Sequence, residues 1–191
     1  MSKKILLCVD CQVDFIEGGK LAVNGGVDAM NNLASHITQH KDDYHSIVCT
    51  VDFHPYNHCS FKENGGQWPL HCVAHTIGAS IAPMVTETFI KENVKPIQLT
   101  KGNFAKMEEY SISDNFRSWQ DLSNLLYDND IKEIDVVGLV REICVLDSIK
   151  GIHKHYPSIK MNVFLNMTPS LDGGEAFNRY AAENSSWLKL L

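Results

Sequence analysis

The stretch "EIDVVGLVREICVLDSIKGIHKHY", residues 133–156, contains the unit that decides the fold. Its first seven residues, 133–139, are rich in Ile, Val and Leu on both faces, which is typical of a strand buried inside a parallel sheet. A helical pattern follows over 142–156 with almost no loop between the two. A buried strand followed directly by a helix is the repeating unit of α/β proteins.

The same alternation recurs along the rest of the chain. Further strands are predicted at 4–10, 46–52, 95–101 and 158–166. Further helices are predicted at 26–40, 113–129 and 174–185. The pattern predicts a doubly wound, Rossmann-like α/β fold with a mostly parallel sheet, helices on both faces and right-handed crossovers. We expect a single domain over residues 1–191, with a loop-rich insertion at about 53–94 over one edge of the sheet.

Composition excludes several classes of protein. The chain has 191 residues, a net charge of −6, 44% hydrophobic and 21% charged residues, as an ordinary globular protein has. No cluster of Lys and Arg suggests a nucleic-acid partner. The apolar run Ile5–Val9 is too short for a signal peptide or a membrane span, so we expect a cytoplasmic protein without a membrane partner. Thiols, not disulfides, are then expected at Cys8, Cys11, Cys49, Cys59, Cys72 and Cys144.

Chemically capable side chains fall at the ends of the predicted strands. Asp10, Asp52 and Lys101 end the first three strands, and Leu139 ends the fourth, shortly before Cys144. The carboxyl ends of parallel strands share one edge of the sheet, where ligands bind. Each residue also has a plain structural interpretation, as a turn cap, a solvated lysine or a buried thiol. Their coincidence at one edge favours a functional site.

Cys144 is the candidate nucleophile among them. At the start of a helix, free N–H groups and the positive end of the dipole stabilise a thiolate, and Lys101 adds to that effect. Asp10 can take the thiol proton and pass it to a leaving amine. Backbone N–H groups near Val140 and Cys144 can hold an oxyanion. Acyl transfer through a thioester needs these parts.

A second candidate site lies in "TVDFHPYNHC", residues 50–59. Asp52 and His54 are two positions apart at a strand end and can point the same way, and His58 and His71 follow. Carboxylate and imidazole ligands suit Zn, Fe(II) or Mn better than Ca or Mg. The alternative is a polar loop whose histidines are solvated or hydrogen-bonded, and spacing alone leaves both interpretations open.

Five segments of the chain, in this order, resemble a known family. They are "DCQVDFIEGGKLAV" (10–23), "DFHPYNHCSF" (52–61), "WPLHCV" (68–73), "TKG" (100–102) and "VVGLVREICV" (136–145). Together they are similar to the nicotinamidases and pyrazinamidases, the cysteine-hydrolase branch of the isochorismatase-like superfamily. The resemblance implies an isochorismatase-like fold and a metal-dependent amidohydrolase. Its reaction would convert nicotinamide, and pyrazinamide as well, to the acid and ammonia, within the salvage of pyridine nucleotides and NAD.

The resemblance also implies the residues of the reaction. The catalytic triad would be Asp10, Lys101 and Cys144, with a thioester on Cys144. A cis peptide between Leu139 and Val140 would turn an N–H group toward the oxyanion.

For the metal-binding insertion, the resemblance implies one divalent transition metal, with zinc preferred over iron or manganese. The ligands would be Asp52, His54 and His71. His58 is a further candidate, because family members differ in their remaining ligands. Phe15 and Trp68 would sandwich the aromatic ring of the substrate. Many members form oligomers, so a homo-oligomer is a candidate partner alongside the small-molecule substrate.

The chain departs from the common family pattern between Val140 and Cys144. Arg141, Glu142 and Ile143 stand where many relatives have Thr-Asp-Tyr or Thr-Asp-His, and a charged pair at the site mouth could alter which amide fits. Two other functions stay open. One is a related amidohydrolase acting on another small amide or a carbamoyl substrate, although such relatives generally lack the Asp/His cluster. The other is a non-catalytic descendant that binds a ligand.

Overall fold

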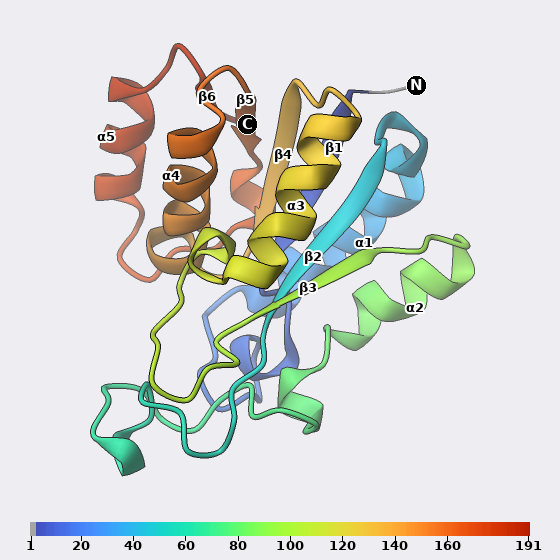
Figure 1. Ribbon diagram of the computed structural model, residues 1–191. Helices are drawn as coiled ribbons and strands as arrows, with labels where there is room; N and C mark the ends of the chain where they lie inside the picture. The colour runs from blue at the N-terminus through green and yellow to red at the C-terminus, as the bar shows by residue number, and fades with distance from the viewer. Residues whose placement is uncertain (1–2) are drawn as a thin grey trace.

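A six-stranded parallel sheet forms the centre of the computed structural model, which describes residues 3–191 (Figure 1). The order of the strands is β3-β2-β1-β4-β5-β6. Their bounds are β1 Lys4–Val9, β2 Ser46–Asp52, β3 Ile97–Lys101, β4 Glu133–Gly138, β5 Lys160–Val163 and β6 Leu188–Leu190. The predicted doubly wound α/β class is confirmed, and the sheet is parallel throughout.

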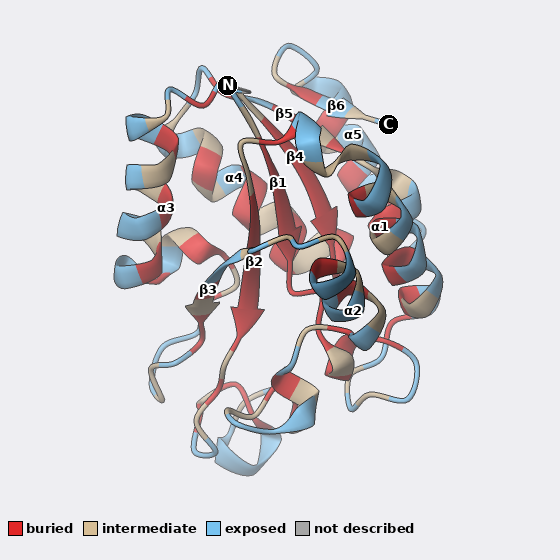
Figure 2. Cartoon of the chain, turned by 90° about the vertical axis from the view of Figure 1, so that its right-hand side faces the viewer, coloured by how far each residue is buried: buried red, intermediate tan, exposed pale blue. Residues whose placement is uncertain are grey.

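Within residues 3–191, five α-helices cover the two faces of the sheet (Figure 2). One face carries α1 (Gly26–His40) and α2 (Pro83–Lys91), and the other carries α3 (Phe116–Asp128), α4 (Leu146–His155) and α5 (Glu175–Glu183). Short 3-10 helices are η1 Val13–Phe15, η2 Lys41–Asp43, η3 Lys62–Asn64, η4 Ile77–Ala79, η5 Ile112–Asp114 and η7 Leu165–Met167, and η6 Arg141–Val145 is a π-helix. Within residues 3–191, no helix has the length and apolar character needed to cross a bilayer.

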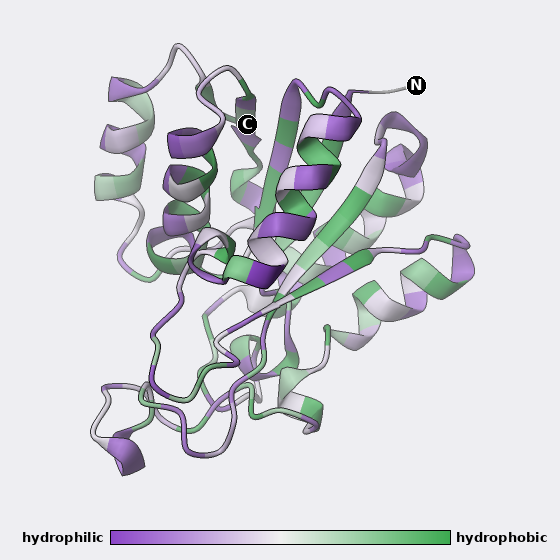
Figure 3. Cartoon of the chain, viewed as in Figure 1, coloured by the Kyte–Doolittle hydropathy of each residue, from purple (hydrophilic) through white to green (hydrophobic). Residues whose placement is uncertain are grey.

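The central strands β1, β2 and β4 are buried on both sides, because successive side chains point to opposite faces and helices cover each face. Along β1, Ile5 and Leu7 pack into the core that includes α3, α4 and α5, whereas Leu6 and Cys8 pack into the core that includes α1 and α2. All four are fully buried, and the strands accordingly appear largely hydrophobic in Figure 3. Full burial of one such aliphatic side chain contributes about 1.5–3 kcal/mol. Two cores of this kind hold the central strands rigidly.

Two elements were not expected from the sequence. Helix α2 lies inside the segment 53–94 that we predicted to be loop-rich, and it begins with Pro83 in its first turn. Strand β6 has only three residues and pairs with β5 at the edge of the sheet. The remaining strands and helices agree with the predicted ranges to within a few residues. The carboxyl ends of the strands point toward the segment 53–82, so this edge of the sheet is covered by long loops (Figure 1).

Candidate active site

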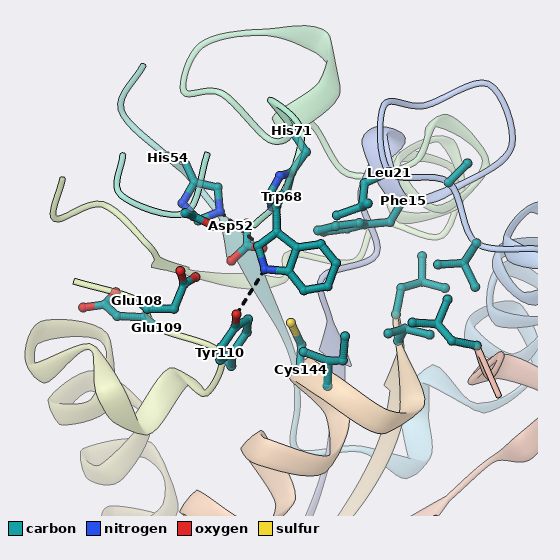
Figure 4. Close-up of a pocket in the computed structure, with 17 residues that line it drawn as sticks. Phe15, Leu21, Asp52, His54, Trp68, His71, Glu108, Glu109, Tyr110 and Cys144 are labelled. Carbon is teal, nitrogen blue, oxygen red and sulfur yellow. Dashed lines mark hydrogen bonds and ion pairs between the residues drawn. The ribbon is translucent and has the colours of Figure 1, made fainter. Parts of the chain in front are cut away.

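A pocket of about 130 Å³ opens where the strand ends meet these loops (Figure 4). Asp52, His54 and His71 line one side of it, and Cys144 and Trp68 line other parts. A cavity of about 150 Å³ holds one benzene molecule, so this pocket has the size of a single small aromatic ring.

The three residues of the predicted triad contact one another: Cys144 lines the pocket, and Asp10 and Lys101 are buried next to it. The Nζ atom of Lys101 lies 2.8 Å from Oδ2 of Asp10 and 3.7 Å from Sγ of Cys144. The hydroxyl of Thr50 donates to Oδ1 of Asp10 at 2.9 Å, which fixes the second carboxylate oxygen. Asp10 and Lys101 are fully buried, and Cys144 is 7% exposed. Three side chains from three separate segments therefore form one contiguous group, called the triad below.

Burial and charge set the protonation of the triad. Burial opposes the charge on Lys101, but the carboxylates of Asp10 and Asp52 outweigh it and raise the pKa of Lys101 well above its usual value. Burial raises the pKa of Asp10 despite the opposing charge of Lys101. Burial also raises the pKa of Cys144 well above its usual value, and Lys101 only partly offsets this. Lys101 therefore favours a thiolate on Cys144, as the sequence suggested, but burial opposes it.

The backbone around Cys144 also differs from the prediction of an ordinary helix start. Cys144 lies in the π-helix η6, and the N–H of Val145 donates to the carbonyl of Val140, five residues earlier, at 3.2 Å. Helix α4 begins only after this turn, at Leu146. The peptide bond between Leu139 and Val140 is cis, and both residues line the pocket beside Cys144.

Asp52, His54 and His71 form a second group, called the Asp–His group below. Each offers a ligand atom, and these atoms lie within 4.8 Å of one another. All three side chains are buried. Oδ1 of Asp52 accepts from Nζ of Lys101 at 2.5 Å, and Oδ2 of Asp52 lies 3.6 Å from Nε2 of His54. Asp10, Asp52 and Cys144 also approach one another closely, but Lys101 already contacts all three.

The backbone sets the orientation of the two histidines. Nδ1 of His54 lies 2.9 Å from the carbonyl of Gly102, and Nδ1 of His71 lies 2.7 Å from the carbonyl of Pro69. A carbonyl accepts only from N–H, so each ring carries a proton on Nδ1 and leaves Nε2 as its candidate ligand atom. Such second contacts are typical of histidines that bind a metal. The donor set therefore fits one divalent metal ion.

His58 has a different environment. Its Nε2 donates to the carbonyl of Met107 at 2.9 Å, and its Nδ1 accepts from the N–H of Ser60 at 3.2 Å. Burial lowers the pKa of His58 to about 4, in keeping with a neutral ring. Both nitrogens thus have backbone partners, and His58 is not part of the Asp–His group.

The two predicted aromatic residues both reach the pocket. Phe15 lies with its ring centroid 5.6 Å from that of His71. Trp68 donates from its indole N–H to the hydroxyl of Tyr110 at 3.1 Å, as Figure 4 shows. The same hydroxyl accepts from Gln67 at 3.1 Å. The hydrogen bond from Trp68 to Tyr110 fixes one edge of the indole.

Arg141 and Glu142 do not lie where the sequence suggested. Neither lines the pocket, so the expectation of a charged pair at its mouth is wrong. Arg141 donates to the carbonyl of Thr168, and Glu142 accepts from the N–H of Leu171. Their charges are used to hold a neighbouring loop.

Several pocket residues were missed by sequence reasoning. Tyr110 positions Trp68, and Glu109 accepts from the N–H of Gly102 at 2.6 Å, next to the carbonyl that holds His54. No spacing pattern marks such supporting roles. Leu171 was missed because it lies far along the chain, in a region with only loose family resemblance.

Comparison with known proteins agrees with this site. No protein-family model matches the chain. The nicotinamidase/pyrazinamidase of Mycobacterium tuberculosis is 34% identical over 172 residues, covering 88% of this chain and 89% of that protein. The pyrazinamidase of Pyrococcus horikoshii in complex with zinc superposes with a TM-score of 0.81 at 27% identity, covering 99% and 98% of the two chains. PnC1 from L. infantum in complex with nicotinate superposes with a TM-score of 0.82 at 26% identity, covering 98% of this chain and 91% of that chain.

Fold, site and relatives together define an amidohydrolase of the isochorismatase-like class. The relative from M. tuberculosis is matched over most of both chains. The chain belongs to the nicotinamidase/pyrazinamidase family.

Proposed function

We propose that this protein hydrolyses nicotinamide to nicotinate and ammonia, and pyrazinamide in the same way, through a thioester on Cys144. One observation carries the proposal: the triad and the Asp–His group converge on a single pocket the size of one aromatic ring. The names of the relatives support the substrate, since they are nicotinamidases and pyrazinamidases. Nicotinate formed in this way would enter the salvage of pyridine nucleotides.

In the first half of the reaction, Sγ of Cys144 attacks the carboxamide carbon while Asp10 takes the thiol proton. The raised pKa of Asp10 suits a base that must soon return a proton. The developing oxyanion would lie near the backbone at Val140 and Cys144. Asp10 then protonates the amide nitrogen, the carbon–nitrogen bond breaks, and ammonia leaves a nicotinoyl thioester on Cys144.

In the second half, Asp10 removes a proton from water, which adds to the thioester carbon. The carbon–sulfur bond breaks, nicotinate leaves, and the proton returns to Cys144. Lys101 contacts both Asp10 and Cys144, so its charge offsets the negative charge that moves between them.

Asp52, His54 and His71 would hold a divalent metal, and zinc is our proposal because carboxylate and imidazole donors suit it. The pyrazinamidase of P. horikoshii is described in complex with zinc. A bound metal there would supply a Lewis-acid contact for a ring nitrogen. Phe15 and Trp68 would hold the ring faces, so that the carboxamide is presented to Cys144.

The test is ammonia release from nicotinamide by the purified protein. Wild-type protein should turn nicotinamide over, chelation should abolish turnover, and zinc should restore it. Cys144→Ala should release no ammonia while retaining its metal. Turnover in the Cys144→Ala variant, or none in the metal-loaded wild type, would overturn the proposal.

A further inference from the structure

Leu171 lies at the mouth of the pocket and is 57% exposed. It belongs to the segment 168–174, which joins η7 to α5. An exposed leucine that also lines a pocket presents apolar surface to whatever binds there. Its side chain therefore belongs to the wall that a bound amide would touch.

Glu142 fixes the backbone at Leu171. One carboxylate oxygen of Glu142 accepts from the N–H of Leu171 at 3.1 Å, and the other accepts from the hydroxyl of Ser170. Hydrogen bonds to a charged acceptor are about twice as strong as neutral ones. Glu142 is outside the pocket lining, two residues before Cys144. It thus connects the wall residue to the turn that carries the nucleophile.

Arg141 fixes the rest of the segment to the same turn. Its Nε donates to the carbonyl of Thr168 at 2.9 Å, and its backbone N–H donates to the carbonyl of Pro169 at 3.1 Å. At the far end, a Cβ on Gly174 would lie 2.6 Å from Nη1 of Arg141, so only glycine fits there without a shift. Segment 168–174 is therefore anchored along its length.

The rest of this wall is apolar. Leu21, Val23 and Ile143 line the pocket together with Leu171. In Figure 4, Leu21 lies across the pocket from His54. The lining thus combines polar groups, namely the Asp–His group, Glu108 and Glu109, with these aliphatic side chains, which we call the apolar wall.

The chemistry of nicotinamide says which ring atom meets the apolar wall. The ring nitrogen and the carbon that bears the carboxamide flank ring position 2, and position 5 is directly opposite. If the carboxamide meets Cys144 and the nitrogen faces the Asp–His group, position 5 points away from both. A substituent at position 5 would then meet lining residues outside both groups, such as Leu171, Leu21 and Val23 of the apolar wall.

We propose that Leu171 determines specificity and that Glu142 is its positioning residue: together they select aromatic carboxamides that carry a small apolar group at ring position 5 over those with a charged group there. This inference rests on the proposed function, because that function sets the orientation of the ring. Arg141 and Glu142 thereby influence substrate choice through Leu171, without touching the substrate.

The test compares kcat/KM for 5-methylnicotinamide and 5-carboxynicotinamide, each relative to nicotinamide. Wild-type protein should prefer the methyl compound. Leu171→Ala should lower the methyl preference about threefold to fourfold, the value of one buried methylene group. Leu171→Lys should raise the relative kcat/KM of the carboxylate about twofold to fivefold, as an exposed ion pair allows. Ile90→Ala, at a leucine-sized residue that is 77% exposed elsewhere, is the matched control and should leave both ratios unchanged.

Glu142→Ala should lower the methyl preference as Leu171→Ala does, through KM, with kcat for the two amides changed by the same factor. Ser170→Ala removes only one of the two hydrogen bonds and should give an intermediate ratio. The double variant of Glu142 and Leu171 should match Leu171→Ala alone, because the two residues act as one unit. Equal losses for both amides in Glu142→Ala, or an unchanged ratio in Leu171→Ala, would overturn the inference.

A second readout separates this inference from the proposed function. Dissociation constants for the same amides are measured on the Cys144→Ala background with and without Leu171→Ala. They give the contribution of Leu171 to binding in a protein that does not turn the amide over. If the wild type is inactive but the Cys144→Ala variant still binds the methyl compound preferentially, the proposed function is overturned and the role of Leu171 is supported. If the Cys144→Ala background that keeps Leu171 shows no methyl preference in binding, while the wild type turns nicotinamide over, the role of Leu171 is overturned and the proposed function stands.

Discussion

Nζ of Lys101 lies 2.5 Å from Oδ1 of Asp52, and this ion pair joins the triad to the Asp–His group. The two residues are register partners on neighbouring strands, β3 and β2. Burial raises the pKa of Asp52, but the charge of Lys101 and the contact with His54 outweigh it and lower that pKa below its usual value. The same buried ammonium group contacts both carboxylates, but at Asp10 its charge only partly offsets the rise in pKa that burial causes.

Asparagine substitutions should separate the two carboxylates. Asp10→Asn should lower kcat by about 10²–10⁴, the contribution of a general acid–base group, while the protein keeps its metal. Asp52→Asn should lose the metal, because a neutral amide oxygen is a poor substitute for a carboxylate ligand. Metal content by mass spectrometry and ammonia release measure the two effects. Loss of metal from Asp10→Asn would contradict the division of roles.

His58 and His54 should differ in their effect on the metal. His54→Ala should lose the metal, because it removes a ligand atom of the Asp–His group. His58→Ala should keep it and should lower the free energy of unfolding by about 1–3 kcal/mol, because the groups of Ser60 and Met107 lose their partner. Metal analysis and urea unfolding check both. A His58→Ala variant without metal would show that His58 is a ligand after all.

Tyr110→Phe should weaken substrate binding more than it slows the reaction. The substitution removes the hydroxyl that accepts from the indole of Trp68. A hydrogen bond of this kind contributes about 1 kcal/mol, so KM for nicotinamide should rise roughly fivefold with kcat nearly unchanged. Steady-state kinetics measure the split, and Tyr127→Phe, at a residue that is 79% exposed, is the control. An unchanged KM would show that Trp68 needs no such support.

Asp135 should matter for stability alone. It is 1% exposed at the opposite end of the sheet from the site, and contacts Nζ of Lys4 at 2.9 Å and the hydroxyl of Tyr44 at 2.8 Å. The side chain of Lys4 is partly exposed, so the main cost of Asp135→Ala is the acceptor lost to Tyr44 and Asn162, and we expect a loss of about 1–3 kcal/mol. Asp130→Ala is the matched control, because this carboxylate pairs with lysines at the exposed surface, where solvent screens an ion pair and stability should hardly change. Urea unfolding should separate the two, and equal losses would contradict the argument.

His36 should make the free energy of unfolding decrease as the pH is lowered. Burial and the neighbouring His40 lower the pKa of His36, whose Nε2 lies 2.6 Å from the hydroxyl of Tyr44. The unfolded chain then takes up the proton more readily than the folded one. The free energy of unfolding should therefore drop as the pH falls through about 6.5, the ordinary pKa of histidine. His36→Asn should flatten this dependence in urea unfolding measured at a series of pH values. If the free energy of unfolding of the variant falls with pH as steeply as that of the wild type, His36 is not the cause.

The sequence predicted the arrangement of the site because strand ends are visible in it. Asp10, Asp52 and Lys101 each close a run of buried strand residues, and parallel pairing brings such ends together. What it could not predict are contacts made by the backbone of distant segments. The spacing of His58 is compatible with metal binding, and only the positions of Ser60 and Met107 show that both ring nitrogens have other partners.

The missed elements have similar causes. Strand β6 is three residues long, too short for any period to appear in the sequence. Helix α2 lies among turns, and only nine residues form it. Arg141 and Glu142 were placed at the pocket mouth by their position beside Cys144, but the direction of a side chain in a π-helical turn is not visible in the sequence.

The long loop between β2 and α2 supplies His71 and Trp68, whereas the three triad residues come from β3, from the end of β1 and from the turn before α4. Part of the surface that would recognise a substrate therefore lies on a loop, apart from the strands and the turn that carry the triad. Insertions or exchanges in that loop can accumulate without disturbing the nucleophile. Proteins with this architecture can therefore change their substrate specificity more readily than their catalytic mechanism.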